Sequence, residues 1–460
     1  MSKPLNTAPA GLRRSIGIWR ASAIVAGIII GASIFVQPSE IILAVPDGRA
    51  AIAVWFGAGL LTLIGALVIA ELSSFWPASG GVYVYLCRAF SPAVGFLWGW
   101  AMFWTMHTGI IAIIAMVFAR YAGTFVDVGP IGSKVMAIAA MLALSAVNYR
   151  GVTHGSAVQV ALTLVKVLAL VLIIGIAFLL GDATASATAS ATASAAASAT
   201  AAGATAGVVT ADGVLKALIA GLFAYGGWHM VSYTAEETVD PTRTIPRALM
   251  IGTLTVTVLY VLANAAYLHV LGVERVAAST RVAAELADAI VGPIGGRVVS
   301  VLVMLSALGA MNGVILAGPR VYQAMATDGL LFKWAAGVHP LFGTPHRAIA
   351  LQATWAVVLI ATGTYRALFT RVVYTEWIFF ALLALALFTM RRRADYAPRY
   401  RAWGYPLLPA VFIVSSVVIV INQIIRDWRD AALGLGMVLV GLPIYYLWSR
   451  PKRGDARTSS

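Results

Sequence analysis

The chain is predicted to be an all-α membrane protein of twelve transmembrane helices, in which two five-helix halves of opposite orientation precede two additional C-terminal helices. Three observations predict this class. Of the 460 residues, 60% are hydrophobic and only 11% are charged, whereas an ordinary soluble domain carries about 25% charged residues. Nearly every apolar run is long enough to cross a bilayer, for which about 20 residues suffice. Two of these runs are interrupted by small residues at matching places.

Twelve apolar spans follow one another along the chain. They cover residues 16–44, 51–75, 92–121, 131–149, 156–180, 213–236, 247–272, 295–325, 347–365, 367–390, 407–425 and 431–449. The first apolar run is too long for the apolar region of a signal peptide, and no small-residue cleavage site follows it. We therefore expect it to remain as a transmembrane span.

Spans one and six are the two that are interrupted. Residues 24–35 contain Gly27 and the run Gly31-Ala32-Ser33, and residues 222–229 contain a pair of glycines. Backbone groups cannot be left unpaired in lipid, so an unwound stretch at membrane depth has to line a cavity enclosed by protein. Two such breaks in two halves point to a solute site at the midplane. The alternative is that the glycines only allow close helix packing.

The basic residues predict the orientation. With the N-terminus inside, most of the 32 Lys and Arg fall on the cytoplasmic side, and Lys166 lies near the middle of a span. An excess of basic residues marks cytoplasmic loops, so the chain is expected in the cytoplasmic membrane with both termini on the cytoplasmic side. The net charge of +14 is then mainly an orientation signal. A nucleic-acid surface is disfavoured, because the basic residues are scattered over alternating loops, with one run at residues 391–393.

The alternating direction of successive spans also predicts the domain organisation. Span one runs from inside to outside and span six from outside to inside, so the two halves form an inverted repeat with the site between them. The expected parts are a cytoplasmic tail at 1–15, the first repeat at 16–181, an outer loop at 182–212, the second repeat at 213–390, spans eleven and twelve at 391–449, and a second cytoplasmic tail at 450–460.

The outer loop contains a low-complexity tract. Residues 183–207 consist of Ala, Thr, Ser and two Gly, without aromatic or charged side chains. Such a segment cannot bury enough surface to offset its ordering entropy, so we expect a loop. The helix propensity of alanine leaves a fraying helix as the alternative.

Several functional classes can be set aside. No Gly-x-x-x-x-Gly-Lys-Ser/Thr sequence occurs, so transport would be driven by gradients rather than by nucleotide hydrolysis. An ion channel would need rings of like residues around one pore, and nothing indicates them. An enzyme would need a nucleophile–base pair or a metal cluster, but the six histidines are scattered. We expect no enzymatic activity, no metal and no cofactor.

Six motifs then occur in order over nearly the whole chain. They are residues 31–35 (GASIF), 79–85 (SGGVYVY), 223–228 (FAYGGW), Glu236-Glu237 with Pro241 and 245–248 (IPRA), 306–313 (SALGAMNG) with 318–320 (GPR), and 401–406 (RAWGYP). With these motifs the chain resembles the amino acid–polyamine–organocation superfamily, closest to its L-type amino acid transporter branch. The resemblance implies the LeuT-like fold of five-plus-five inverted repeats and the transport of free amino acids.

The break in span one predicts how an amino acid would bind. The amides of Gly31, Ala32 and Ser33 lose their intrahelical partners and face the N-terminal end of a half-helix, which suits an α-carboxylate. The freed carbonyls of Ile29, Phe223 and Gly226 suit an ammonium. One site would then read both ends of a zwitterion.

Phe223 and His229 are further candidates for the site. The resemblance places an aromatic ring at Phe223 as an outer occlusion gate, with core packing as the alternative. The family commonly has Gly-Ser-Gly in its first motif, whereas Ser33 here adds a side chain where the substrate backbone packs. The family's Asn after Trp228 is replaced by His229, which could titrate near neutral pH or hydrogen-bond a substrate side chain. A structural histidine is the alternative.

Lys166 lies near the middle of span five, and an ionisable residue inside a membrane is a functional candidate by default. The resemblance places a span-five lysine where sodium-coupled relatives of the fold hold sodium, at the junction of helices one, five and eight. Its ammonium would replace the ion and bind freed carbonyls near Gly27 and Ile28. An ammonium removed from water also gives up its proton more readily, so Lys166 could carry a proton. Sodium-independent transport is expected.

Charged residues at the cytoplasmic ends of the spans predict an inner gate or a solvated loop. They are Glu71, Glu236, Glu237, Arg243 and Arg320. Two intramembrane groups are weaker candidates. Glu376 in span ten could relay a proton, but we expect it to pair with Arg371 near the outer interface. His107 in span three is a lesser candidate for the permeation path.

The side-chain preference and the partners complete the predictions. No acid is evidently placed in the pocket for a cationic side chain, which favours neutral amino acids. A transporter of cationic amino acids or polyamines, and a non-transporting sensor, are the alternatives. Exchange and proton-coupled uptake both stay open. Light-chain relatives join a partner glycoprotein through a cysteine, but the only cysteine here, Cys87, is predicted on the cytoplasmic side. We therefore expect no disulfide-linked partner.

Overall fold

The computed structural model is built of helices. It describes residues 12, 14–31, 33–126, 128–196, 208–279, 281–292, 294–363 and 365–448, without the side chains of 181–196 and 365–372. These ranges contain no β-strand, and the one bridge between extended segments joins Ile16 to Thr238. The prediction of an all-α protein is confirmed.

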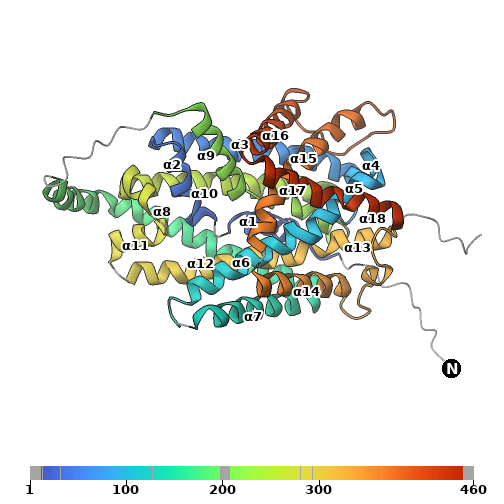
Figure 1. The fold of residues 1–460 in the computed structure, drawn as a ribbon, viewed down its shortest axis with the longest axis horizontal. Coiled ribbons are helices and arrows are strands. Elements are labelled where there is room, and N and C mark those ends of the chain that lie inside the picture. The colour runs from blue at the N-terminus through green and yellow to red at the C-terminus, as the bar shows by residue number, and fades with distance from the viewer. Residues whose placement is uncertain are drawn as a thin grey trace, which may run out of the picture.

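The long helices run side by side along the longest axis of the molecule (Figure 1). The elements are α1 (Ile18–Ile29), η1 (Ser33–Phe35), α2 (Gln37–Ala44), α3 (Gly48–Phe75), α4 (Val82–Ala89), α5 (Pro92–Ala101), η2 (Met102–Met106), α6 (His107–Ala122), α7 (Gly129–Tyr149), α8 (Val152–Ala196), α9 (Ala211–Ala224), η3 (Trp228–Glu237), α10 (Pro241–Ala278), α11 (Val282–Val291), α12 (Ile294–Ala317), α13 (Pro319–Thr327), η4 (Lys333–Ala336), α14 (His346–Thr362), α15 (Tyr365–Arg391), α16 (Leu407–Arg426), α17 (Trp428–Leu439) and α18 (Gly441–Trp448).

Ten helical segments of the described chain are long and apolar enough to cross a membrane. They are Gly48–Phe75, Pro92–Ala122, Gly129–Tyr149, Val152–Leu180, Ala211–Glu237, Pro241–Ala278, Ile294–Thr327, Val373–Arg391, Leu407–Arg426 and Trp428–Trp448. Two shorter apolar helices, Ile18–Ile29 and His346–Thr362, fall within the predicted spans one and nine. Each predicted span thus coincides with a helix, while the count of twelve crossings stays a prediction.

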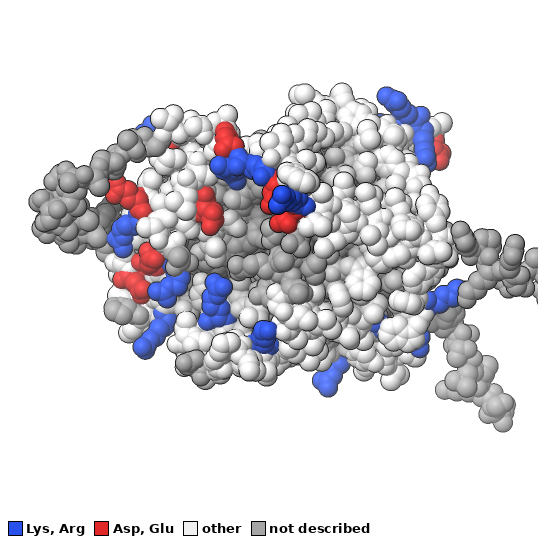
Figure 2. Space-filling model, in the orientation of Figure 1, with Lys and Arg blue, Asp and Glu red and all other residues white. Residues whose placement is uncertain are grey.

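Helix α8 buries its polar side chains and exposes apolar ones, as expected for a helix in contact with lipid. On α8, the buried residues Ser156, Gln159, Thr163 and Lys166 recur at helical spacing, whereas Leu164 and its neighbours on the opposite face are exposed. In water such an apolar face would favour association. Figure 2 shows a broad area right of centre that carries no charged side chain.

The low-complexity tract is partly helical. The structure continues α8 through Ala196, where a loop was expected, and residues 197–207 lie outside the described residues. Alanine has the highest helix propensity of all residues, which favours continuation of the helix despite the β-branched threonines.

Both predicted breaks occur. The first span is divided into α1, η1 and α2, and the sixth into α9 and η3. Helix α1 packs against α8, α10 and α12. The first break is thereby surrounded by helices of both halves.

Candidate functional site

The first break removes α1 carbonyls from the helical hydrogen-bond ladder. The Gly31 amide donates to the carbonyl of Ile29 at 2.7 Å, not to the carbonyl of Gly27 four residues back. The carbonyls of residues 27–31 therefore need other donors, because an unpaired buried carbonyl is costly. Side chains of three other helices supply them.

Lys166 on α8 supplies donors for two of these carbonyls. Its buried Nζ donates to the carbonyl oxygens of Gly27 and Ile30, both at 2.6 Å, and lies 3.3 Å from that of Ser306 on α12. All three N–H groups of the ammonium can be used in this way. The second carbonyl is that of Ile30, not of Ile28 as expected from the sequence.

Two further side chains complete the set, and sequence reasoning missed both. The Ser306 hydroxyl lies 3.2 Å from the carbonyls of Ile30 and Gly31. The Tyr260 hydroxyl on α10 donates to the carbonyl of Ile29 at 2.9 Å and lies 3.4 Å from that of Ala224 at the second break. Tyr260 thus links the two breaks. Ser306 belongs to a recognised motif, which could have indicated it.

The second break is a glycine turn that packs on the first. Helix α9 ends at Ala224, and the Gly226 amide donates to the carbonyl of Phe223 at 3.1 Å. Gly227 has φ +90° and ψ −3°, a left-handed conformation that favours glycine. A Cβ at this position would overlap the Ile28 side chain. The turn therefore needs glycine for conformation and for space.

A cavity of about 370 Å³ lies between the two breaks. Drug-sized ligand pockets have volumes of about 300–1,000 Å³, so an amino acid fits. Of the predicted substrate residues, those that line it are Ile29, Gly31, Ser33, Phe223 and Gly226. Ala32 lies outside the described residues. The Phe223 side chain is 39% exposed on the cavity wall.

The cavity contains an acid that the sequence did not place there. Glu376 on α15 is the only Asp, Glu, Lys or Arg among the described lining residues. Its Oε1 lies 3.6 Å from Nε2 of His229. The side chain of Arg371, the partner expected for Glu376, lies outside the described side chains. The absence of an acid therefore no longer supports a preference for neutral substrates.

His229 is fully buried and does not line the cavity. Its ring is surrounded by those of Trp98, Trp228, Tyr233 and Phe380, with centroids 5.1–5.7 Å away. His229 therefore cannot touch a molecule bound in the cavity, and it could affect such a molecule only through Glu376 or through these rings. His107 does not line the cavity either, and its Nδ1 lies 2.9 Å from the Tyr322 hydroxyl.

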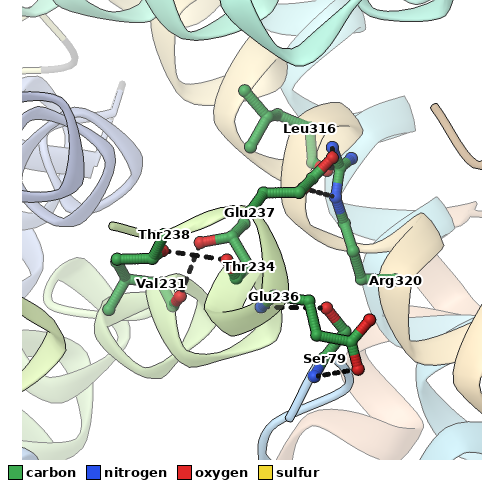
Figure 3. A network of polar contacts seen from close by, with 8 residues as sticks. All are labelled: Ser79, Val231, Thr234, Glu236, Glu237, Thr238, Leu316 and Arg320. Atoms are coloured by element: carbon green, nitrogen blue, oxygen red, sulfur yellow. Dashed lines mark hydrogen bonds and ion pairs between the residues drawn. The ribbon is translucent and has the colours of Figure 1, made fainter. Parts of the chain in front are cut away.

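The charges predicted at the cytoplasmic ends of the spans form two separate networks, where one cluster was expected. Arg320 makes a bidentate pair with Glu237, at 2.7 and 2.9 Å, with both side chains buried (Figure 3). Arg320 also donates to the carbonyl of Leu316. Glu236 turns the other way, and its carboxylate accepts from the Ser79 amide at 3.3 Å (Figure 3).

Glu71 belongs to the second network. Its carboxylate pairs with Arg391 at 2.8 and 2.6 Å and accepts from the Ala402 amide at 2.6 Å. Glu71 therefore joins α3 to the segment that precedes α16, and it makes no pair with Arg320. Arg243 lies on the surface, 3.7 Å from Asp240.

The chain before α1 is fastened to the end of η3. The amides of Ser15 and Ile16 donate to the carbonyl of Glu237 at 2.8 and 3.0 Å, and the Val239 amide donates to that of Ile16 at 3.0 Å. These bonds lie beside the Glu237–Arg320 pair. No group of three His, Cys, Asp or Glu among the described residues could hold a metal ion.

Comparison with known proteins identifies the family to which the chain belongs. The amino acid permease family matches residues 16–437. The serine/threonine exchanger SteT of Bacillus subtilis is 31% identical over 446 residues, 96% of this chain and 98% of its own. The b(0,+)-type amino acid transporter 1 of Mus musculus is 30% identical over 98% of this chain and 91% of its own. The cystine/glutamate transporter of Homo sapiens is 26% identical, with 96% and 87% covered.

These relatives are transporters and not enzymes. The family match and the apolar helices together establish a multi-pass membrane protein. The chain is therefore a member of the amino acid permease family, within the amino acid–polyamine–organocation superfamily, and its function is amino acid transport.

Proposed function

We propose that this permease moves free L-amino acids across the cytoplasmic membrane by alternating access and without sodium. The contacts of Lys166 carry the proposal. Unwound backbone carbonyls coordinate the sodium ion in transporters with broken helices. Here the Lys166 ammonium bonds to the carbonyls of Gly27 on α1 and of Ile30, directly after α1, and approaches that of Ser306 on α12. The Lys166 ammonium would therefore take the position that a sodium ion has in sodium-coupled transporters.

The substrate backbone would be bound at the two breaks. The Gly31 amide, expected from the sequence to be free, already donates to the Ile29 carbonyl, so the amide of Ser33 is the one that would face an α-carboxylate. The Gly226 region would offer carbonyls to an α-ammonium. Most of the remaining lining is apolar, including Ile113, Leu222 and Phe380, which favours uncharged side chains. Glu376 is the exception.

The inner gate would be the Glu237–Arg320 pair together with the chain before α1. Opening towards the cytoplasm requires η3, α12–α13 and the residues before α1 to separate, and the buried pair and the bonds to the Glu237 carbonyl hold these segments together. The Glu236–Ser79 contact would also help to hold the inner gate closed. The Glu71–Arg391 pair joins α3 to the segment before α16 and is not part of this gate. The orientation, with both termini cytoplasmic, and the twelve-span inverted repeat are parts of the same proposal.

The test begins with thermal stability of the detergent-purified protein against a panel of amino acids and polyamines. A ligand present at 100 times its Kd stabilises the folded state by about 2.7 kcal/mol. Ligands that stabilise are then tested for uptake and counterflow in liposomes, with sodium replaced by N-methylglucamine.

We expect stabilisation by one class of uncharged amino acids, and uptake that changes less than twofold on sodium removal. Loss of uptake without sodium would overturn the sodium-independent mechanism. Stabilisation confined to lysine, arginine or polyamines would favour the cationic alternative, and binding without counterflow would favour a sensor.

A further inference from the structure

Glu376 is a carboxyl group in a mostly apolar cavity at membrane depth. Its side chain is 13% exposed, and no Lys or Arg side chain that the structure describes forms an ion pair with it. The lining beside it includes Val373, Trp377 and Phe380. An unpaired carboxylate in such surroundings is costly. The group therefore needs either a counter-charge or a proton.

His229 is the titratable group that faces Glu376. Nε2 of the imidazole lies 3.6 Å from Oε1 of the carboxyl, and neither ring nitrogen has a hydrogen-bond partner. When the pair holds one shared proton, it has no net charge, whether it is an acid beside an imidazole or a carboxylate beside an imidazolium. When this proton leaves, the pair carries one negative charge in an apolar cavity.

Further unpartnered polar atoms gather behind His229. Among the described residues, His107 Nε2 and Gln352 Oε1 are buried without hydrogen-bond partners, and Tyr233 OH and Trp98 Nε1, which lie near each other, make no well-formed hydrogen bond. The Tyr233 ring lies 5.6 Å from that of His229 and 5.7 Å from that of His107. Buried polar atoms without protein partners are usually satisfied by ordered water. The cluster therefore has the composition of a hydrated site.

The cluster leads away from the cavity towards the cytoplasmic side. Tyr233 follows His229 by four residues along η3, and η3 ends at Glu237 in the buried pair with Arg320. The titratable groups that act on His229 and Tyr233 through space are His107, Glu376, Tyr322 and Tyr85. Beside His107 lies the π-helical turn η2, a distortion frequently found at functional sites.

We propose that Glu376 and His229 together bind the proton that couples amino acid uptake, and that water held by Trp98, Tyr233 and His107 passes it towards the cytoplasm. A hydronium ion in the cavity gives its proton to the Glu376 carboxylate and becomes water. The O–H bond then breaks as an N–H bond forms at Nε2 of His229, and the proton on Nδ1 leaves to water behind the ring. Tautomer exchange through that water then returns the imidazole to the Nδ1–H form, so that Nε2 can accept the next proton. Lys166 has a different role, because its N–H groups are directed at three carbonyls.

This inference rests on the proposed function, and its test separates the two. The protein is reconstituted in liposomes with an amino acid that supports counterflow. Accumulation is measured with and without an inward proton gradient at clamped membrane potential, and an internal dye records pH. The quantity compared between variants is the stimulation of uptake by the gradient, normalised to counterflow at equal pH.

In the wild type we expect at least tenfold stimulation together with internal acidification. Glu376→Gln should reduce the stimulation to about onefold, Glu376→Asp should restore part of it, and His229→Asn should reduce it and shift its pH midpoint. Glu274→Gln makes the same chemical change at an exposed position near the end of α10 and serves as the matched control. It should behave as the wild type.

Counterflow without any stimulation in the wild type, or unchanged stimulation in Glu376→Gln, would overturn the proton pair while leaving amino acid transport in place. Selective loss of binding of lysine or ornithine in Glu376→Gln, with stimulation kept, would instead assign Glu376 to a cationic side chain. If none of the amino acids that stabilise the protein supported counterflow, both proposals would be overturned.

Discussion

A single ammonium group replaces much of the hydrogen bonding that α1 loses where it unwinds. The carbonyls of Gly27 and Ile30 both receive N–H groups of Lys166 at 2.6 Å. Hydrogen bonds from charged groups contribute about 1.5–3 kcal/mol each, and the desolvation of the ammonium offsets part of this gain. The balance decides how much Lys166 stabilises the fold.

We predict that Lys166→Met lowers the free energy of unfolding by about 2–4 kcal/mol. Methionine keeps the length of the side chain but leaves the Gly27 carbonyl without its donor, whereas Ile30 keeps Ser306. Thermal melting of the detergent-purified protein measures the effect. Lys216→Met is the matched control, because Lys216 makes only an exposed pair with Asp212 at 3.0 Å. Equal melting temperatures of the two variants would contradict the prediction.

The Glu237–Arg320 pair predicts strong coupling between two side chains. Removing one partner of a buried ion pair costs about 3–5 kcal/mol, because the other charge stays buried without compensation. We expect Glu237→Gln and Arg320→Leu each to destabilise the protein by this amount, and the double variant to lose less than the sum. The measurement is a double-mutant cycle of melting in detergent. Additive losses would show that the two side chains do not act as a pair.

At the scale of elements, the two broken helices support each other. Tyr260 reaches the carbonyl of Ile29 in one break and approaches that of Ala224 in the other. Gly227 packs on Ile28 so closely that a Cβ would overlap it. A change at one break therefore disturbs the other, which is the coupling that alternating access requires.

Gly227→Ala tests this contact between the breaks. A left-handed conformation costs a non-glycine residue about 1–2 kcal/mol, and the overlap with Ile28 adds to the cost. Gly363→Ala separates the two terms, because Gly363 has nearly the same conformation, φ +75° and ψ 9°, with nothing within 4 Å of its Cβ. We expect about 1 kcal/mol for Gly363→Ala and about 2–4 kcal/mol for Gly227→Ala. Similar melting temperatures would mean that Ile28 yields without cost.

At the scale of the whole molecule, the helices followed from hydropathy and the breaks from glycine, because both depend on local sequence. The predicted span at 131–149 corresponds to Gly129–Tyr149, and that at 407–425 to Leu407–Arg426. The contacts between distant residues could not be derived in this way. Tyr260 meets the carbonyl of a residue 231 positions away.

The same limit applies to side-chain direction. Successive residues of a 3-10 helix diverge by about 120°, so the choice between Glu236 and Glu237 as the partner of Arg320 depends on the rotation of η3. The rotation of α15 likewise decides that Glu376 faces the cavity. A single sequence gives no measure of either rotation.

Cys87 provides a test of the orientation of the whole molecule. It is the only cysteine of the chain, and it lies on α4, which connects the second and third spans on the side predicted to be cytoplasmic. Burial raises the pKa of the Cys87 thiol to about 11, and only the thiolate reacts with maleimide. At pH 7 about one thiol in ten thousand is ionised, so labelling should be slow and should accelerate about tenfold per pH unit up to about pH 11.

A membrane-impermeant maleimide should therefore label Cys87 in inside-out vesicles at pH 9 and leave it unlabelled in intact cells. A variant with Cys87→Ser and Thr124→Cys reverses the arrangement, because Thr124 is exposed beyond the end of α6, on the side predicted to be outside. It should label only from outside. Labelling of Cys87 in intact cells would invert the orientation, and the gate proposed at the Glu237–Arg320 pair would then face the outside. A rate that levels off near pH 8.5, the ordinary pKa of a free thiol, would show instead that the thiol is not held in a buried position.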